Sequence, residues 1–441
     1  MTQSGMRSSR RTARARAVAP ALTLALALAV VAGACASDPD PQAGVTRAPG
    51  VEPRQVAPAG AAALDDVVEA TRRVGVAMLA AAPEEANAVA SPSSLAVALS
   101  MLADGARGGT LAQLEEVLGA SGEQRRDAVA ALRGALAEHD GDPAVVQDEE
   151  LPEQPVVHLA TQVVVDDQLT PSPQYLRTLA DVYGAGVRRV DLGADTSALD
   201  DWVQHHSGGL IKKSAIEPDP DLRLVLQDAI VLAARWSSPF PQYATAPRPF
   251  TLADGSRIEA QTMAATLDVA YAEVDGWRAA RLPYGDGALH ADLLLPPGDP
   301  TVATPTLLAD LDAALSAAAP QPVEVWLPTL DLQPDPLDLR ASVAALGAPT
   351  VLDPTAADLT GLGTDDGGRR LYLGQAVQQA VFQVDEDGTR AAAVTELGVE
   401  AAGAPAIPTV ELHLDRPFLI EVAHAETSWP LFLAAVRDPR H

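Results

Sequence analysis

The chain has 441 residues, of which 47% are apolar, 20% are charged and 4% are aromatic, a composition typical of a globular protein. Lys and Arg total 31 against 59 Asp and Glu, so the formal net charge is -28. Such an acidic chain repels phosphate backbones, and we therefore expect no nucleic-acid binding. The single cysteine, Cys35, excludes an internal disulfide and a cysteine-rich zinc site.

Residues 1–35 are predicted to be an export signal. Arginine is the only charged residue type before Cys35, and the apolar run APALTLALALAVVAGA directly precedes that cysteine. Pro20 and the short length of the run argue against a retained membrane helix. AGAC at 32–35 resembles a bacterial lipoprotein cleavage site, which implies that Cys35 is lipidated and begins the mature chain. The alternative is an ordinary signal-peptidase site, which leaves a soluble product. Both alternatives predict an extracellular or cell-surface protein.

Residues 36–61 are rich in Pro, Gly and Ala without periodicity, and are predicted to be a flexible linker.

The body, residues 62–441, contains no second linker and no internal repeat. Helical spacing of apolar residues predicts helices over 64–81, 95–102 and 111–118. We expect Ser91 or Ser94 to cap the second helix. Thr110 should cap the third, with Gln113 three residues later completing a capping box.

Strand-like runs follow, and they predict strands over 157–167, 222–236, 290–297, 323–328, 376–387, 409–424 and 431–439. Helices thus lie mainly in the first half of the chain and strands mainly after residue 155, which favours an α+β domain. The acidic, proline-bearing segment 139–155 is predicted to be a solvated surface loop.

The chain lacks the usual catalytic and metal-binding motifs. It contains no HExxH, no GxSxG, no Walker loop and no GxGxxG. His205 and His206 are adjacent, so they cannot share one face of a helix. The run QVDEDGTRAAAV has a partial likeness to an EF-hand loop, but Gln383 and Val394 stand where two of the strongest calcium ligands are required. We therefore predict no enzyme, no metal and no cofactor.

Several segments resemble the serpin family of protease inhibitors, in the family's order, across residues 62–440. They are NAVASPSSLAVALSMLADGARGGTLAQLEEVLG, WVQHHSGGLIKK, LRLVLQDAIVLAARWSSPF, RLPYGDGALHADLLLP, VEVWLP, ALGAPTVLDPTAADLTGL, DRPFLIEV and LFLAAVRDP. The resemblance implies an α+β serpin fold, in which a helical cluster lies on a large central β-sheet with two smaller sheets and an exposed reactive loop.

The resemblance also assigns a role to VDEDGTRAAAVTELGVEAAGAPAIP at 384–408, as hinge and reactive loop. The implied hinge residues are Glu386, Gly388, Thr389, Ala391, Ala393 and Thr395. Counting from Gly388 in the family's manner places the reactive bond between Ala402 and Gly403, with Ala401 and Ala404 as alternatives.

In such inhibitors the loop is bait for a protease. Once the protease has formed an acyl-enzyme with the cut loop, residues 388–401 insert into the central sheet as a new strand and trap it. Alternate side chains of a middle strand enter the core. The inward set is uniformly small and consists of Thr389, Ala391, Ala393 and Thr395. The other set begins with Arg390 and should face solvent. About ten new strand residues would gain on the order of 10 kcal/mol, at roughly 0.5–1.5 kcal/mol per hydrogen bond.

The region where the sheet opens is implied to comprise Ser91, Ser94, Asp228, Trp236 and Gln378. Gln378 and Asp228 replace a His and an Asn of the family, and a Gln–Asp hydrogen bond with Ser91 or Ser94 can take over their network. The alternative is that these residues pack independently. Glu386 and Trp236 correspond to residues near the top of the sheet, where insertion begins.

Small residues at the reactive bond suit shallow specificity pockets, so the predicted partner is an elastase-like or subtilisin-like serine protease. We expect a monomer. The alternative function is that of a non-inhibitory serpin, acting as a binding or scaffold protein. Such serpins typically carry charged or bulky residues at the inward hinge positions, and this chain has small ones there.

Overall fold

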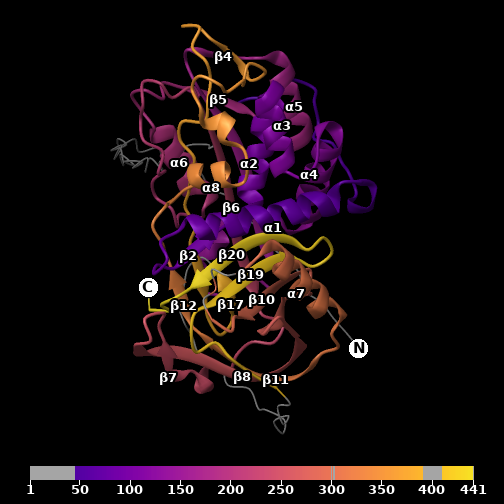
Figure 1. Cartoon of the computed structure of the whole chain (residues 1–441), viewed down its shortest axis with the longest axis vertical. Helices are drawn as coiled ribbons and strands as arrows, with labels where there is room; N and C mark the ends of the chain where they lie inside the picture. The colour runs from indigo at the N-terminus through magenta and orange to yellow at the C-terminus, as the bar shows by residue number, and fades with distance from the viewer. Residues whose placement is uncertain (1–44, 299, 301–302, 391–409, 441) are drawn as a thin grey trace, which may run out of the picture. The chain divides into compact units, whose positions relative to one another are not determined.

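The computed structural model describes residues 45–440, apart from 299, 301–302 and 391–409 and the side chain of Asp228. These residues belong to one compact unit built from helices and twisted sheets (Figure 1). The helices are α1 (Leu64–Ala81), α2 (Pro92–Gly105), α3 (Gly108–Val117), α4 (Gly122–Leu136), α5 (Pro173–Tyr183), α6 (Ser197–His206), α7 (Pro305–Ala317) and α8 (Arg340–Ala345).

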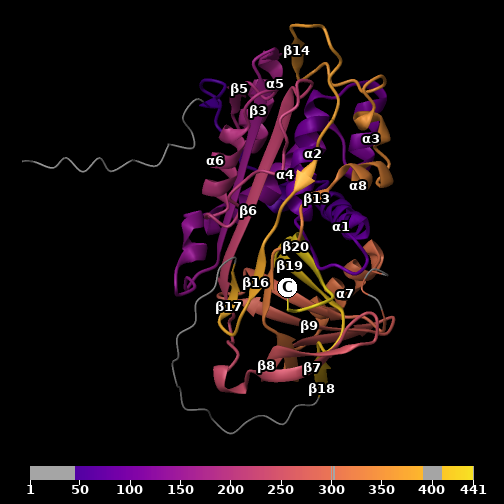
Figure 2. The same ribbon diagram turned by 90° about the vertical axis from the view of Figure 1, so that its left-hand side faces the viewer.

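The central sheet has the strand order β1-β5-β3-β6-β17-β16-β12. Its strands are β1 (Val45–Thr46), β5 (Val187–Val190), β3 (Val156–Asp166), β6 (Leu224–Arg235), β17 (Gly388–Arg390), β16 (Phe382–Val384) and β12 (Leu330–Leu332). The long strands β3 and β6 pair antiparallel along almost their whole length. Helix α6 lies on one face of these strands and α2 and α4 on the other, so both faces are covered (Figure 2).

The two smaller sheets share one strand, β8. Near its start β8 pairs with β7, in its middle with β11, and at its end with β9. The strands of this part are β2 (Ala88–Ala90), β7 (Ala246–Thr251), β8 (Arg257–Val274), β9 (Trp277–Tyr284), β10 (Leu289–Leu295), β11 (Gln321–Pro328), β18 (Val410–His413), β19 (Phe418–His424) and β20 (Trp429–Val436). Two short pairs complete the fold: β4 (Leu169–Pro171) with β14 (Gly363–Asp365), and β13 (Leu337–Asp338) with β15 (Val377–Gln378).

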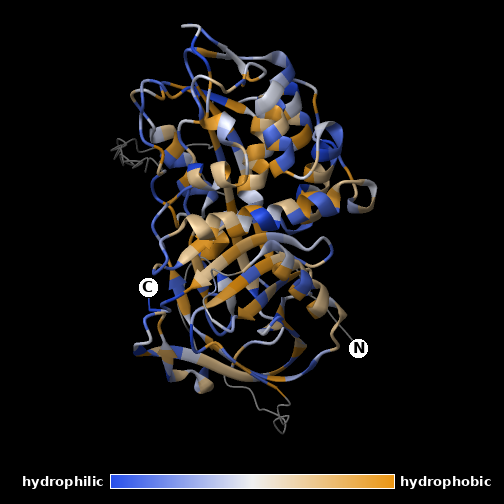
Figure 3. Cartoon of the chain, in the orientation of Figure 1, coloured by the Kyte–Doolittle hydropathy of each residue, from blue (hydrophilic) through white to orange (hydrophobic). Residues whose placement is uncertain are grey.

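Burial explains the apolar runs of the sequence. Every residue of β19 and β20 is buried, so these strands are mostly apolar on both faces rather than alternating, with Glu421 and His424 as buried polar exceptions (Figure 3). Helices at the surface, such as α5, alternate apolar and polar residues because they bury only one side, whereas α2 is buried along almost its whole length. Among the described residues, no helix is long and apolar enough to span a bilayer.

The three predicted helices are confirmed as α1, α2 and α3, and Ser91 caps α2 by accepting a hydrogen bond from the Ser94 N–H (3.4 Å). The predicted capping box at Thr110 is wrong, because α3 begins at Gly108. The Thr110 hydroxyl instead accepts from the Asp358 N–H (3.0 Å), and thereby fixes a distant loop. Helices α4 to α8 were not predicted.

The segment before residue 62 differs from the expected flexible linker where it is described. Strand β1 pairs with β5 at the edge of the central sheet. The guanidinium of Arg54 binds the carboxylates of Glu123 (2.9 Å), Asp127 (2.7 Å) and Asp181. The folded unit therefore includes residues 45–61. The predicted export signal and Cys35 lie outside the described residues.

The acidic segment 139–155 is also more structured than expected. It contains a short 3₁₀ turn at Pro143–Gln147. Val146 and Leu151 are buried against Val231 and Ala233 of β6. The prediction of a solvated loop is wrong for these apolar residues, because they cover the face of the central sheet while the charged residues between them stay exposed.

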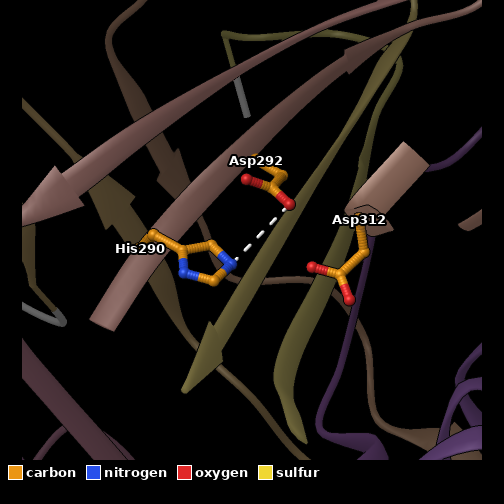
Figure 4. A group of neighbouring side chains, drawn as sticks. All are labelled: His290, Asp292 and Asp312. Atoms are coloured by element: carbon orange, nitrogen blue, oxygen red, sulfur yellow. Dashed lines mark ion pairs between the residues drawn. The ribbon is translucent and has the colours of Figure 1, made fainter. Parts of the chain in front are cut away.

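A buried cluster of charges connects β9, β10 and α7 with α1. Arg281 binds Asp292 (2.7 Å) and Asp312 (2.6 Å), and Arg72 binds Asp312 (2.7 Å). The His290 Nε2 lies 3.7 Å from the Asp292 carboxylate (Figure 4). His290, Asp292 and Asp312 are close enough together for a metal ion. We assign no metal to them, because the two guanidinium groups already bind the carboxylate oxygens.

Glu421 lies directly across from Asp292 and is 3% exposed. Burial raises the pKa of Glu421 to about 8, since the nearby Asp292 and Asp312 offset the opposing effect of the arginines. The folded chain therefore holds a proton that the unfolded chain releases above about pH 4.5. It follows that the free energy of unfolding falls as the pH rises from about 4.5 to about 8.

We predict that Glu421→Gln abolishes this pH dependence. The variant should be more stable than the parent protein above pH 8, by on the order of a few kcal/mol, because the amide cannot ionise in the core. Thermal unfolding midpoints between pH 5 and pH 9 provide the test. The exposed Glu411→Gln on β18 serves as the matched control, and a parallel pH profile for parent and Glu421→Gln would contradict the prediction.

Candidate functional site: the hinge and the open edge of the central sheet

The hinge is a tight turn between β16 and β17. The Asp385 N–H donates to the Gly388 carbonyl (3.0 Å). The Asp385 carboxylate accepts from the N–H groups of Asp387 (2.9 Å) and Gly388 (3.0 Å). Aspartate at the first position and glycine at the fourth are typical of a four-residue turn. The sequence DEDG, which has a partial likeness to a calcium loop, therefore forms a hairpin.

Strand β17 lies between β6 and β16, so the first residues of the predicted reactive loop are already part of the central sheet (Figure 2). A β carbon on Gly388 would lie 2.1 Å from the Ala234 carbonyl oxygen and 2.8 Å from the Arg235 Cα. Only glycine therefore lets β17 approach β6 this closely.

Thr389 and Trp236 meet at Tyr284. The Thr389 hydroxyl lies 2.5 Å from the Tyr284 hydroxyl, inside the molecule. The Trp236 ring stacks on the Tyr284 ring with their centroids 4.5 Å apart. Burial raises the pKa of Tyr284, so this phenol stays protonated and can donate a hydrogen bond to Thr389. The stacked rings of Trp236 and Tyr284 thus support the start of β17.

Trp236 and Glu386 hold the turn from two sides. The Trp236 backbone N–H donates to the Asp387 carbonyl (2.8 Å), and its indole N–H donates to the Asp385 carbonyl (3.0 Å). The Glu386 carboxylate accepts from the Thr245 hydroxyl (2.6 Å). The structure therefore places both residues at the same turn, at the end of β6.

Arg390 does not face solvent, in contrast to the expectation. It lies on the opposite face of β17 from Thr389, as strand alternation requires, but it is only 3% exposed. Its guanidinium donates to the carbonyls of Asp148 (2.9 Å) and Glu149 (3.1 Å). The reason is that the acidic segment 139–155 covers this part of the sheet.

The structure brings Ser91, Ser94 and Gln378 together. The Gln378 amide accepts from the Ser91 N–H (2.7 Å) and donates to the Ser91 carbonyl (3.0 Å). The Ser91 hydroxyl binds that of Ser94 (2.9 Å). Gln378 thus reaches the Ser91 backbone rather than a hydroxyl. Asp228 lies opposite Thr161 of β3, and its side chain is outside the described part of the structure.

A cavity of about 150 Å³ begins beside Thr389 and Arg390 and continues between β6 and residues 375–382. Helix α6 and residues 207–216 line it on one side, and α2 lines it on the other. Most of its lining side chains are apolar, among them Leu95, Leu226 and Ile230.

Beside this cavity, one edge of β6 is open. One edge of β6 pairs with β3. Among the described strands, the edge that faces the cavity pairs only with β17, and only at residues 233–235. Within the described ranges, no strand pairs with residues 224–232 on this edge. Backbone N–H and C=O groups in such a position can accept another strand.

Helix α6 is fixed over this region by a histidine pair. The His158 Nε2 on β3 lies 2.9 Å from the His206 Nδ1, and the His158 Nδ1 lies 2.8 Å from the Asp140 carboxylate. Burial lowers the pKa of His206 to about 3, so this ring is neutral at physiological pH. The His206 ring also packs against Trp202 of the same helix, with the ring centroids 4.5 Å apart.

The remaining predicted site residues lie outside the described residues, namely Ala391, Ala393, Thr395, Ala401, Ala402, Gly403, Ala404 and Cys35. Sequence reasoning missed Tyr284, Thr245 and Leu151, which reach the hinge from distant segments. The predicted strand over 376–387 is wrong at its end, because β16 stops at Val384 and the chain turns there. The three-residue spacing of Asp385 and Gly388 could have identified this turn.

Known proteins resemble this chain over most of its length. A family model described as Serpin (serine protease inhibitor) matches residues 69–439. Iripin-5 of Ixodes ricinus is 30% identical over 379 residues, which cover 83% of this chain and 93% of that protein. Plasminogen activator inhibitor 1 of Sus scrofa is 29% identical over 380 residues, which cover 81% and 88%.

Solved structures agree with these sequences. The thermophilic serpin tengpin in its native state matches with a TM-score of 0.73 at 22% identity, over 89% of this chain and 99% of that one. Human kallistatin matches with a TM-score of 0.71 at 22% identity, over 86% and 98%. The described strands and helices thus have the serpin fold, and the chain belongs to the serpin family of serine protease inhibitors.

Proposed function

We propose that this serpin inhibits serine proteases as a suicide substrate. Cleavage of the reactive loop near Ala402 leaves the protease attached as an acyl-enzyme, and residues 388–401 then insert into the central sheet before water releases it. The observation that carries the proposal is the open edge of β6, which lies in line with β17 and beside a cavity.

The register of β17 defines where an inserted strand would lie. Continued along β6, it would place Ala391 opposite Leu232, Ala393 opposite Ile230 and Thr395 opposite Asp228. These residues share the face of Thr389, which points to Tyr284 inside the molecule. Small side chains suit this narrow space, whereas large ones would require the neighbouring helices to move.

The target class follows from the residues around the reactive bond. Ala401, Ala402 and Gly403 suit proteases with shallow specificity pockets, and a protease that requires a basic residue is excluded by their size and lack of charge. We therefore propose elastase-like or subtilisin-like targets. The predicted export signal before Cys35 supports action outside the cytoplasm, with a membrane tether if Cys35 is lipidated.

Incubation of the purified protein with elastase-like and subtilisin-like proteases should give a complex that survives denaturant. Mass spectrometry should detect a released fragment that begins near Gly403. A trypsin-like protease should give neither product. Digestion by every protease without a stable complex would falsify the proposal.

Ala393→Arg serves as a variant that separates cleavage from trapping. It should be cut at the same bond but form no stable complex, because an inward guanidinium would have to be buried in the sheet without a partner.

The change in thermal stability on cleavage of the reactive loop distinguishes an inhibitory serpin from a non-inhibitory one. An inserting loop should raise the thermal unfolding midpoint by about 10 °C or more, because the new hydrogen bonds contribute on the order of 10 kcal/mol. The measurement compares intact protein with protein cut in the reactive loop. An unchanged midpoint would favour the binding or scaffold role instead.

A further inference from the structure

The connection between α4 and β3 covers the hinge on one face of the central sheet. Its apolar residues Val146 and Leu151 are buried against Val231 and Ala233 of β6. Ala233 is also the cross-strand partner of Arg390. The connection therefore packs on the part of β6 with which the first reactive-loop residues pair.

Leu151 contacts both strands at this point. Its Cδ1 lies 2.6 Å from the position that a Gly388 β carbon would occupy, so the side chain sits directly over the glycine. Its carbonyl accepts a hydrogen bond from the Arg235 guanidinium (3.0 Å), and Arg235 lies opposite Gly388 in the sheet. Displacing Leu151 would uncover the start of β17.

The charged guanidinium of Arg390 binds backbone carbonyls of the same connection. Its Nη1 donates to the carbonyls of Asp148 and Glu149, and its Nε lies 3.5 Å from the Asp385 carboxylate. A guanidinium stays charged when it is buried, so it needs these oxygen partners. Because the donor is charged, the two hydrogen bonds to the carbonyls are stronger than neutral ones.

We propose that residues 148–151 and Arg390 form a hinge clamp, which holds the first residues of the reactive loop in the central sheet before any cleavage. Arg390 is a positioning residue of this clamp. The role in trapping rests on the proposed inhibitory function, whereas the position of the hinge does not.

The clamp is compatible with both states of the loop. Arg390 already has the register that a fully inserted strand would continue, so insertion need not break its contacts. Insertion then starts from residues that are already paired rather than from a free loop. The entropic cost of bringing the first loop residues to the edge of β6 is therefore met before cleavage. Since insertion competes with hydrolysis of the acyl-enzyme, the hinge clamp favours trapping over release.

Hydrogen–deuterium exchange of the uncleaved full chain tests the position of the hinge. In Arg390→Met, peptides covering 385–390 should exchange about tenfold faster or more, because strong hydrogen bonds from a charged donor are lost. Peptides from β19 and β20 should be unchanged, which separates loss of the clamp from general destabilisation. Arg390→Lys keeps a cation near the carbonyls and should retain most of the protection. Arg257→Met, at an exposed arginine on β8, is the matched control.

Leu151→Ala tests the other half of the hinge clamp with Arg390 intact. It should accelerate exchange over the same peptides, and it remains informative if Arg390→Met does not fold. Unchanged exchange over 385–390 in the folded variants would overturn the proposal.

The stoichiometry of inhibition tests the role in trapping. For a protease that forms the stable complex, Arg390→Met and Leu151→Ala should require several-fold more inhibitor per protease, with the excess cleaved as substrate. Faster exchange with an unchanged stoichiometry would overturn this role. If the parent protein traps none of the proteases, the proposed function fails, and the exchange experiment still decides whether the clamp exists.

Discussion

The open hydrogen-bonding edge of β6 is the constraint on which the rest of this structure depends. Over residues 224–232 the strand is paired with β3 on one side, and among the described residues nothing pairs with it on the other. A buried strand edge is tolerated only when something covers it. Helix α6, residues 207–216 and α2 cover it here and leave a cavity between them. Within the described part of the chain, the fold therefore combines an unpaired edge of β6 with an adjacent, mostly apolar cavity.

The hinge fixes the position and register of β17 beside this edge. A four-residue turn reverses the chain at Asp385 to Gly388, and the absence of a side chain on Gly388 lets β17 lie directly against β6. Trp236 and Thr245 fix the turn from outside the sheet, and Tyr284 supports Thr389 from within. A strand inserted as proposed would continue β17 in the same register.

The acidic connection between α4 and β3 illustrates why net charge was a poor guide to local structure. Its carboxylates could have been expected to bind the cation of Arg390, since the segment is rich in Asp and Glu. Instead the backbone carbonyls of Asp148 and Glu149 do so, while their side chains remain exposed. Composition predicted a solvated segment, and the few apolar residues within it, Val146 and Leu151, decided its position.

The sequence by itself determined the features that depend on local chemistry. These are the amphipathic helix Leu64–Ala81, the cap at Ser91, the inward side chain of Thr389, and the ordered motifs of the serpin family. Spacing and propensity are properties of neighbouring residues, so they can be read without a fold. The hydrogen-bond partners of the Arg390, Glu386 and Thr389 side chains lie more than one hundred residues away. Only the tertiary structure decided these contacts, because they depend on which distant segments the sheet topology brings to the end of β6.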